Sequence, residues 1–383
     1  PAGPATHAEH ARKSPKIETM RLINICGARP NFMKIAPLMR AYREEPGIEP
    51  LLVHTGQHYD HKMSRLFFEE LEIPRPDLNL EVGSGSHAQQ TAVIMQRFEP
   101  VLLETGADAV LVVGDVNSTI ACALVASKLG KAVFHVEAGL RSFDRSMPEE
   151  INRVLTDAIS DLLFVSEPSG LDNLTREGTP ADRIHFVGNV MIDTLERNRA
   201  RAEDSHILAD LGLASGTYGV ITMHRPAAVD HPEIMAPLIQ AFADIQRDLP
   251  LVFPVHPRTR ARLTEAGLDR QIGELKNLRL IEPVGYLDFL KLMAHAALVL
   301  TDSGGMQEET TILGVPCLTL RENTERPVTL TRGTNELVGM DPARLLAGYR
   351  RIRQQPLRAA DRPEKWDGQA ARRIARILAE WRR

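Results

Sequence analysis

Three carboxylates within residues 108–153 have the types and the spacing for acid–base chemistry. Asp115 and Glu137 each follow a short apolar run, and Glu149 stands a few residues further on. The two runs have the length and valine content of buried parallel strands, with a helix-compatible segment between them. Such strands end at one edge of the sheet, where open α/β folds bind their ligands. We expect the carboxylates to converge there, so that one can donate a proton while another accepts one.

The alternative is that these residues cap strand ends and form surface ion pairs. For any single Asp or Glu that interpretation is the better one. Here two arginines, Arg141 and Arg153, accompany the three carboxylates at the same predicted sheet edge. The combination favours a reaction site.

Cations follow the first predicted strand. Gly27 stands at a strand-to-helix turn, and Arg29 and Lys34 lie in that turn and the helix after it. Glycine lets the backbone approach a ligand, and a helix N-terminus attracts anions. The spacing matches neither the dinucleotide fingerprint nor the P-loop, so a plain turn with surface cations is an equal alternative.

Polar groups also follow the predicted strands of the second half. His224 and Arg225 follow the first of them, His256 the second, and Arg326 lies in the segment after the fifth. A lone histidine such as His256 is more often a structural residue. Because these groups share the ligand edge of a second sheet, together they favour a nucleotide site.

The fourth strand of this half leads into a turn of small residues that opens a helix. The amides of Ser303, Gly304 and Gly305 can hold a phosphate at that helix start. Glu309 lies six residues past Ser303, where a carboxylate suits a ribose diol better than a phosphate.

Three glutamines stand where they could contact a sugar or nucleotide. Gln57 follows the second predicted strand, and Gln89 and Gln90 begin a long helix predicted at residues 88–105. A local hydrogen bond or a helix cap accounts for them equally well.

Composition describes an ordinary two-domain protein. The chain has 383 residues, 43% of them hydrophobic and 25% charged, with a net charge of -4. This balance suggests neither nucleic acid nor a membrane surface as a partner. No apolar stretch reaches the roughly 18 residues needed to span a bilayer. Residues 1–19 lack an apolar core and are expected to be a disordered extension or tag remnant.

The three cysteines, Cys26, Cys122 and Cys317, are far apart and sit within apolar runs. Their spacing is not that of a metal site. We expect buried, reduced thiols in a cytoplasmic protein.

Strand and helix patterns alternate in both halves, which predicts two Rossmann-like, doubly wound α/β domains facing one another across a central cleft. The boundary is placed at Gly188–Asn189, giving domains at residues 20–189 and 190–366. An amphipathic helix at residues 367–383 ends the chain. The predicted strands are residues 21–26, 51–55, 78–80, 109–113, 132–136, 162–165, 184–187, 220–223, 251–255, 278–281, 298–301 and 316–320.

An ordered series of motifs resembles the bacterial non-hydrolysing UDP-N-acetylglucosamine 2-epimerase family, from about residue 22 to the C-terminus. The motifs are Gly-Ala-Arg-Pro…Lys at 27–34, Thr-Gly-Gln-His at 55–58, Gly-Asp at 114–115, His-Val-Glu-Ala-Gly-Leu-Arg at 135–141, Pro-Glu-Glu…Asn-Arg at 148–153, His-Arg-Pro at 224–226, Asp-Ser-Gly-Gly…Gln-Glu-Glu at 302–309 and Thr-Glu-Arg-Pro at 324–327.

The resemblance implies a GT-B-like architecture in which the C-terminal helix crosses back onto the first domain. It implies reversible epimerisation at C2 of UDP-N-acetylglucosamine to UDP-N-acetylmannosamine, a precursor of surface polysaccharides. UDP is eliminated and re-added through a bound 2-acetamidoglucal, with no NAD and no obligatory metal. It further implies a cytoplasmic homodimer.

The resemblance also assigns roles by position, leaving open which carboxylate is the base in each step. The catalytic residues would be Asp115, Glu137, Glu149 and His224. The substrate and UDP contacts would be Arg29, Lys34, Arg153, Arg225, His256, Ser303, Gly304, Gly305, Glu309 and Arg326. Some members bind a second, activating UDP-N-acetylglucosamine, and Gln57, Gln89 and Gln90 would form that allosteric site.

Two departures bear on substrate choice. Pro226-Ala227-Ala228 stands where many members have Arg-Glu-Asn, and the turn at residues 28–32 differs from the commoner Thr-Arg-Pro-Glu-Ala. An acidic or 3-acetamido UDP-sugar is therefore an alternative substrate.

Three further functions remain open from the sequence. A hydrolysing epimerase would use the same motifs and release N-acetylmannosamine and UDP. A GT-B glycosyltransferase would need an acceptor site and usually one base rather than three clustered carboxylates. A non-catalytic nucleotide-sugar sensor would not need the carboxylates.

Overall fold

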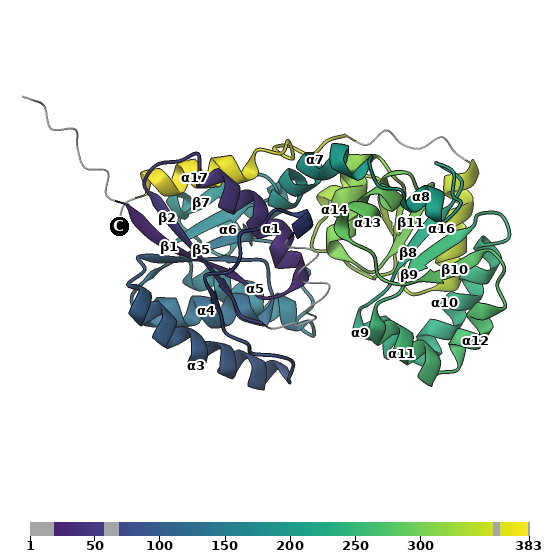
Figure 1. Cartoon of the computed structure of the whole chain (residues 1–383), viewed down its shortest axis with the longest axis horizontal. Helices are drawn as coiled ribbons and strands as arrows, with labels where there is room; N and C mark the ends of the chain where they lie inside the picture. Colours follow the sequence, from purple (N-terminus) through teal and green to yellow (C-terminus); the bar gives the residue numbers. More distant parts are fainter. Residues whose placement is uncertain (1–18, 57–68, 355–360, 382–383) are drawn as a thin grey trace, which may run out of the picture.

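The computed structural model describes residues 19–56, 69–354 and 361–381 (Figure 1). The expected N-terminal extension lies outside the described residues except for residue 19. Gln57 and most of the helix expected at residues 63–71 also lie outside them.

The first half forms a parallel sheet of seven strands in the order β3-β2-β1-β4-β5-β6-β7. The chain runs outward from β1 to β3, then returns to β4 on the other side of β1. Ligands of open α/β sheets bind at such a reversal. The strands are β1 (Met20–Cys26), β2 (Ile48–His54), β3 (Leu78–Asn79), β4 (Ala109–Val113), β5 (Ala132–Ala138), β6 (Leu162–Val165) and β7 (Ile184–Phe186).

The second half repeats this topology in a six-stranded parallel sheet, ordered β10-β9-β8-β11-β12-β13. Its reversal lies between β8 and β11. The strands are β8 (Gly219–Thr222), β9 (Leu251–Pro254), β10 (Leu278–Ile281), β11 (Leu298–Thr301), β12 (Cys317–Thr319) and β13 (Asn335–Leu337). The sequence did not predict β13, because three residues with a polar start show no apolar run. The predicted α/β class, with two Rossmann-like doubly wound units, is confirmed.

Several helices begin with proline, whose missing N–H costs nothing at the first helical position. The helices are α1 (Arg29–Ala41), α3 (His87–Thr105), α4 (Asn117–Lys128), α5 (Pro148–Ile159), α6 (Pro168–Arg176), α7 (Val190–Ala202), α8 (Ile207–Asp210), α9 (Pro226–Val229), α10 (Pro232–Ile245), α11 (Pro257–Glu265), α12 (Leu268–Gly273), α13 (Tyr286–Ala294), α14 (Gly304–Leu313), α15 (Val328–Thr331), α16 (Pro342–Gln354) and α17 (Ala370–Glu380), with a 3-10 turn at Ala181–Arg183.

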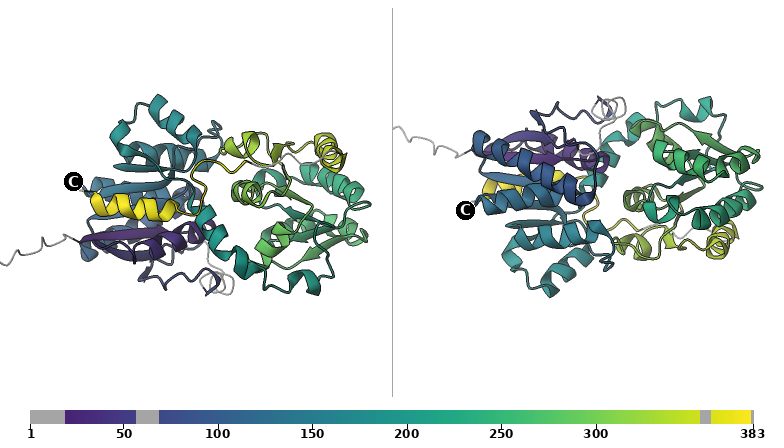
Figure 2. Two further views of the ribbon diagram at one scale, coloured as in Figure 1. Left: turned by 90° about the horizontal axis from the view of Figure 1, so that it is seen from above. Right: turned by 90° about the horizontal axis from the view of Figure 1, so that it is seen from below.

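Helices cover both faces of each sheet (Figures 1 and 2). In the first half α3, α4 and α5 pack together on one face, while α1 and α17 pack together on the other. The central strands β4 and β5 are fully buried, as their continuous apolar runs require.

Helix α7 lies against elements of both halves. It contacts α1 and α17 as well as α13 and α14. The chain crosses back after α16, and α17 buries Ile374, Ala375 and Leu378 in the core beneath α1. The ring of Trp381 then meets Phe134 edge-on, with centroids 5.0 Å apart.

The three cysteines are buried and free, as expected. None of the helices in the described part of the chain is both long and apolar enough to cross a bilayer.

Candidate active site

The carboxyl ends of the central strands place the candidate residues at the reversal of each sheet. Asp115 follows β4 beside β1, and His224 follows β8 beside β11. Glu137 is the second-last residue of the neighbouring strand β5. An ion pair between Glu137 and Arg326 joins the two halves.

Glu137 is the centre of the first cluster. It is buried, with Lys34 of α1 paired to Oε2 and Arg326 paired to Oε1 at 2.5 Å. Its backbone has a φ of +74° at a register shift between Val136 and Ala138, a β-bulge. A left-handed backbone at a non-glycine residue costs about 1–3 kcal/mol and is typical of functional sites.

Gly114 leaves room for the ion pair between Lys34 and Glu137. Its φ is +67°, and a Cβ at this position would lie 2.8 Å from Nζ of Lys34. The next residue, Asp115, pairs with Nη2 of Arg153 at 2.5 Å, with its side chain 25% exposed. The carboxylate of Asp115 is therefore partly open to solvent, while the arginine that pairs with it is buried.

Asp115 is an anionic residue of this cluster. Burial opposes its ionisation, but Arg153, Lys34 and Arg326 outweigh that effect and lower its pKa below the ordinary value. Asp115 is therefore available at neutral pH to accept a proton or to stabilise a cation. Cations separate the clustered carboxylates, so charge pairing sets their behaviour more than mutual repulsion does.

Glu149 and Glu150 begin α5, and only Glu150 is ion-paired to Arg153. Glu150 is buried and accepts hydrogen bonds from the amides of Ser142 and Phe143, both at 2.9 Å. Glu149 is half-buried on the same first turn. Glu150 thus anchors the loop before α5, and Glu149 stays the predicted catalytic residue.

Arg326 joins the two halves of the molecule. Besides Glu137 it pairs with Glu308 at 2.6 Å and with Glu325. Burial alone would favour the neutral guanidine, but the carboxylates raise the pKa of Arg326 well above its ordinary value. The charged guanidinium is buried among three carboxylates, those of Glu137, Glu308 and Glu325.

The start of α14 lies against this guanidinium. A Cβ on Gly304 would stand 2.5 Å from Nη1 of Arg326 and 2.9 Å from Oε1 of Glu325. Ser303 precedes the helix as its N-cap residue in extended conformation. A helix start beside a cation suits an anion. The amide of Ser303, however, already donates to Oγ1 of Thr301 at 2.9 Å, and the predicted phosphate contact of Ser303, Gly304 and Gly305 stays a prediction.

His224 is held by Asp302. Its Nδ1 lies 2.9 Å from Oδ1 of the fully buried Asp302, while the imidazole is 53% exposed. The second oxygen of Asp302 accepts the amides of His224 and Arg225, both at 2.8 Å. The pairing holds the ring beside Asp302, and its exposure gives the imidazole access to solvent, as acid–base work requires. His256 is an exposed N-cap of α11.

Glu309 is buried inside α14 rather than displayed at its start. The hydroxyl of Tyr286 donates to it at 3.1 Å. Burial raises the pKa of Glu309 to about 8. Its predicted contact with ribose stays a prediction.

The comparisons with known proteins decide the family. Residues 40–379 match the family model described as UDP-N-acetylglucosamine 2-epimerase. A UDP-N-acetylglucosamine 2-epimerase of Methanocaldococcus jannaschii is 43% identical over 369 residues, 94% of this chain and 99% of that protein. The chain belongs to the UDP-N-acetylglucosamine 2-epimerase family. The family predicted from the motifs is confirmed.

Two further relatives bear on function. The crystal structure of the M. jannaschii enzyme in complex with UDP-GlcNAc and UDP is 43% identical, with a TM-score of 0.88, covering 94% of this chain and 100% of that one. A Pseudomonas aeruginosa UDP-2,3-diacetamido-2,3-dideoxy-D-glucuronate 2-epimerase is 40% identical over 94% of this chain and 100% of its own length.

The structure brings together five of the residues predicted for this epimerase family. Asp115, Glu137, Lys34, Arg153 and Arg326 form one connected network. His224 and Arg225 share Asp302 at the other reversal.

Residues of the predicted second nucleotide site have other partners here. Gln89 forms a capping box with Ser86 and is exposed. Gln90 is buried and accepts a hydrogen bond from Asn117 at 2.9 Å. Gln57 and the side chain of Arg29 lie outside the described part of the structure. The allosteric site of this epimerase stays a prediction.

Sequence reasoning missed four buried acids: Glu150, Asp302, Glu308 and Glu325. All four lie within the family motifs, beside residues to which a role was assigned. The sequence carries a signal for two of them, since Glu325 directly precedes Arg326 and Glu150 stands one helical turn before Arg153. Their partners are decided only by packing.

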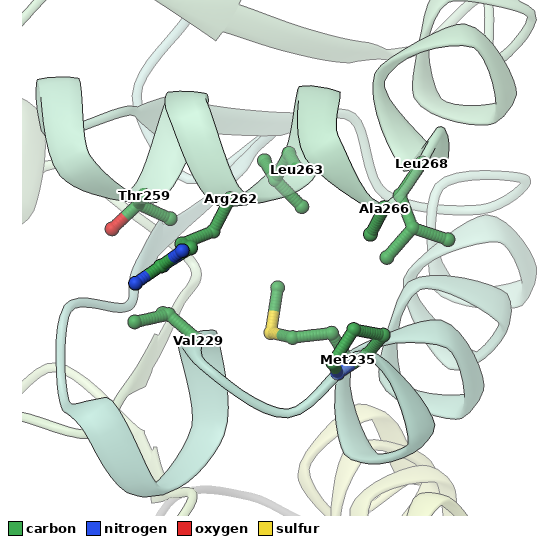
Figure 3. Close-up of a pocket in the computed structure, with 8 residues that line it drawn as sticks. Val229, Met235, Thr259, Arg262, Leu263, Ala266 and Leu268 are labelled. Atoms are coloured by element: carbon green, nitrogen blue, oxygen red, sulfur yellow. The ribbon is translucent and has the colours of Figure 1, made fainter.

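A small apolar cavity lies away from these residues, between α9, α10 and α11 (Figure 3). Val229, Met235 and Leu263 point into it. Nearby, Thr259 donates to the carbonyl of Met223, the residue before His224, at 2.9 Å. The cavity is a packing feature behind the catalytic turn. Among the described residues no cluster of His, Cys, Asp and Glu could hold a metal ion.

Proposed function

We propose that the protein interconverts UDP-N-acetylglucosamine and UDP-N-acetylmannosamine. The reaction would eliminate UDP to a bound 2-acetamidoglucal and add it back after protonation of C2 from the opposite face. The observation that carries the proposal is the network of Asp115 and Glu137 with Lys34, Arg153 and Arg326. The network holds carboxylates that can act at C2 of the sugar beside cations that can stabilise a leaving diphosphate.

The chemistry needs both kinds of charge. The C2 proton is not next to a carbonyl, so cleavage of the C1–O bond must run ahead and build positive charge on the sugar. A carboxylate stabilises that charge and a carboxylate removes the proton. Asp115, with its lowered pKa, is ionised for either task. Which carboxylate acts as base in each direction is left open.

The nucleotide would bind to the second half. The amides at the start of α14 and the guanidinium of Arg326 suit a diphosphate. His224, fixed by Asp302, would face the same region as an acid–base group. The M. jannaschii relative, solved with UDP-GlcNAc and UDP, supports this assignment.

The proposal includes no NAD and no metal. Elimination and re-addition change no oxidation state overall, so the reaction needs no redox cofactor. Charge on the leaving group is met by Lys34 and Arg326.

We also propose that the enzyme is a cytoplasmic homodimer that supplies UDP-N-acetylmannosamine for surface polysaccharides. Free buried cysteines suit a reducing compartment. The outer face of α5 exposes Ile151, Val154 and Leu155, which are 42%, 38% and 50% exposed, beside Phe143. Exposed apolar stripes of this kind favour self-association. A second, activating UDP-N-acetylglucosamine near Gln89 and Gln90 completes the proposal.

Proton NMR of UDP-N-acetylglucosamine with the enzyme in deuterated water tests the proposal. A new UDP-N-acetylmannosamine anomeric signal with deuterium at C2 is the expected result. Formation of free N-acetylmannosamine and UDP would show instead that the enzyme is a hydrolysing epimerase. Transfer of the sugar to an added acceptor, without epimerisation, would replace it by a glycosyltransferase.

A second candidate substrate is UDP-2,3-diacetamido-2,3-dideoxyglucuronate. The P. aeruginosa relative named for that substrate is nearly as similar as the M. jannaschii one, at 40% against 43% identity. The same experiment with both UDP-sugars decides between them. A higher kcat/KM for the diacetamido sugar would make it the substrate.

A further inference from the structure

The position of Glu137 in its strand predicts one face of the sheet for its side chain, but the side chain lies on the other face. Side chains alternate along a strand, and Phe134 and Val136 of β5 lie in the core on the α1 side. His135 and Glu137 should both point the other way. Glu137 instead contacts Lys34 of α1, because the β-bulge and its φ of +74° turn it over the strand end. The bulge therefore decides whether Glu137 reaches the site.

The bulge is held from outside the strand. Two side chains hydrogen-bond to the backbone of Gly139, which follows the bulge. Asp157 Oδ2 accepts from the Gly139 amide at 3.0 Å, and Asn173 donates to the Gly139 carbonyl at 2.9 Å. Gly139 has a φ of +79°, and a Cβ there would lie 2.5 Å from the Gly170 carbonyl oxygen. Asp157 thus fixes the turn that carries Glu137.

The same aspartate reaches the turn that carries Asp115. Asp157 Oδ1 lies 2.6 Å from His135 Nδ1, and His135 Nε2 lies 2.8 Å from the carbonyl oxygen of Gly114. The imidazole is fully buried. One histidine–aspartate pair therefore connects the two turns.

The partners of His135 determine its protonation. A carbonyl oxygen and a carboxylate oxygen both only accept, so each ring nitrogen must donate. A neutral imidazole has one N–H and would leave one of these short contacts without a hydrogen. Arg141 donates to Asp157 at 2.7 Å and pairs with Glu177 at 2.6 Å, so an imidazolium completes a balanced cluster of two cations and two anions. Burial acts to raise the pKa of Asp157, but His135 and Arg141 outweigh that effect and lower it below the ordinary value.

We propose that His135 is a doubly protonated positioning residue, whose ion pair with Asp157 holds Asp115 and Glu137 at their catalytic positions. The proposal rests on the proposed function for its kinetic consequence alone. His135 touches no substrate in this assignment. It acts through the backbone at Gly114 and, through Asp157, at Gly139.

NMR of histidine-labelled wild-type enzyme without substrate tests the protonation. Two slowly exchanging ring N–H signals are expected for His135 at pH 7 to 8, identified by their change in Asp157→Asn. That variant keeps an oxygen for Gly139 and turns an amide N–H toward Nδ1. The ring then needs only the N–H on Gly114, so a single signal is expected. One ring N–H in the wild type would overturn the proposal.

Kinetics test the positioning. Asp157→Ala should lower kcat by about 10- to 100-fold, the scale of a small misplacement of catalytic groups. UDP affinity should fall less than kcat, because the start of α14 and Arg326 lie in the other half of the molecule, and Asp157→Asn should recover most of the loss in kcat. The matched control is His185→Gln on β7, the edge strand of the same sheet, with unchanged kcat.

Counting active sites by UDP binding separates positioning from stability. A purely structural role would reduce the number of binding sites and leave kcat per site unchanged, which would overturn the proposal. If Asp157→Ala does not fold, Asp157→Asn and the wild-type spectrum still decide it. A wild type that converts neither UDP-sugar refutes the proposed function, whereas the ring signals are read without either sugar.

Discussion

Substitution of Glu167 by glutamine should stabilise the protein in alkaline but not in acidic solution. Glu167 follows β6 and is buried, with its Oε1 accepting from Ser169 at 2.6 Å. Its Oε2 has no hydrogen-bond partner within the described structure. Burial, together with nearby Glu308 on the other half of the molecule, raises the pKa of Glu167 to about 7.

The magnitude follows from linkage. The unfolded carboxyl ionises near its ordinary value of 4.5 and the folded one near 7. Between these values the folded state binds more protons, so stability falls as pH rises from about 4.5 to about 7 and is level above. At about 1.4 kcal/mol for each pH unit, the loss amounts to about 3 kcal/mol. Glutamine cannot ionise and escapes this loss.

Urea unfolding at pH 4.5 and pH 8 measures the effect. Fluorescence can follow it locally, because the buried Trp366 donates its indole N–H to the carbonyl of Ser166 at 2.8 Å. The change caused by Glu167→Gln should be more favourable at pH 8 than at pH 4.5 by about 3 kcal/mol. Comparing two pH values cancels whatever the amide does to the hydrogen bond with Ser169.

The matched control is the exposed Glu104 on α3, where Glu104→Gln should change by less than about 0.5 kcal/mol between the two pH values. A pH-independent effect of Glu167→Gln would show that the carboxyl is ionised normally in the folded protein. The reasoning from burial and from Glu308 would then be refuted.

Three further outcomes are expected. Asp115→Asn, Glu137→Gln and Glu149→Gln should each lower turnover at least about 100-fold in the NMR assay, and near-native turnover in all three would reject the site. Arg326→Ala should weaken UDP binding at least about tenfold by calorimetry, whereas undiminished affinity would remove it from the diphosphate site. Met235→Ala, which enlarges the cavity of Figure 3, should cost about 2–5 kcal/mol in urea unfolding, and a loss below about 1 kcal/mol would mean that the cavity collapses.

The sequence by itself determined the class of fold and predicted where the candidate site lies. Apolar runs such as Ala109–Val113 are buried on both faces, so they read directly as central parallel strands. Parallel strands end at one edge, which places Asp115 near Glu137 and His224 near Ser303 from the strand pattern alone. Local patterns suffice for these conclusions because hydrophobic burial acts along each segment separately.

Only the tertiary structure decided how the side chains are directed and paired. Side-chain alternation along β5 predicts that Glu137 points away from α1, and a β-bulge turns it toward α1. Asp157 and Asn173, from other elements, hydrogen-bond to the residue after this bulged segment. Arg326 meets Glu137 across 189 residues of chain. The ion-pair partner of Arg153 at the start of α5 is Glu150. These pairings follow from how the two sheets and their helices pack, because charge interactions depend on distance in space and leave no periodic signal in the sequence.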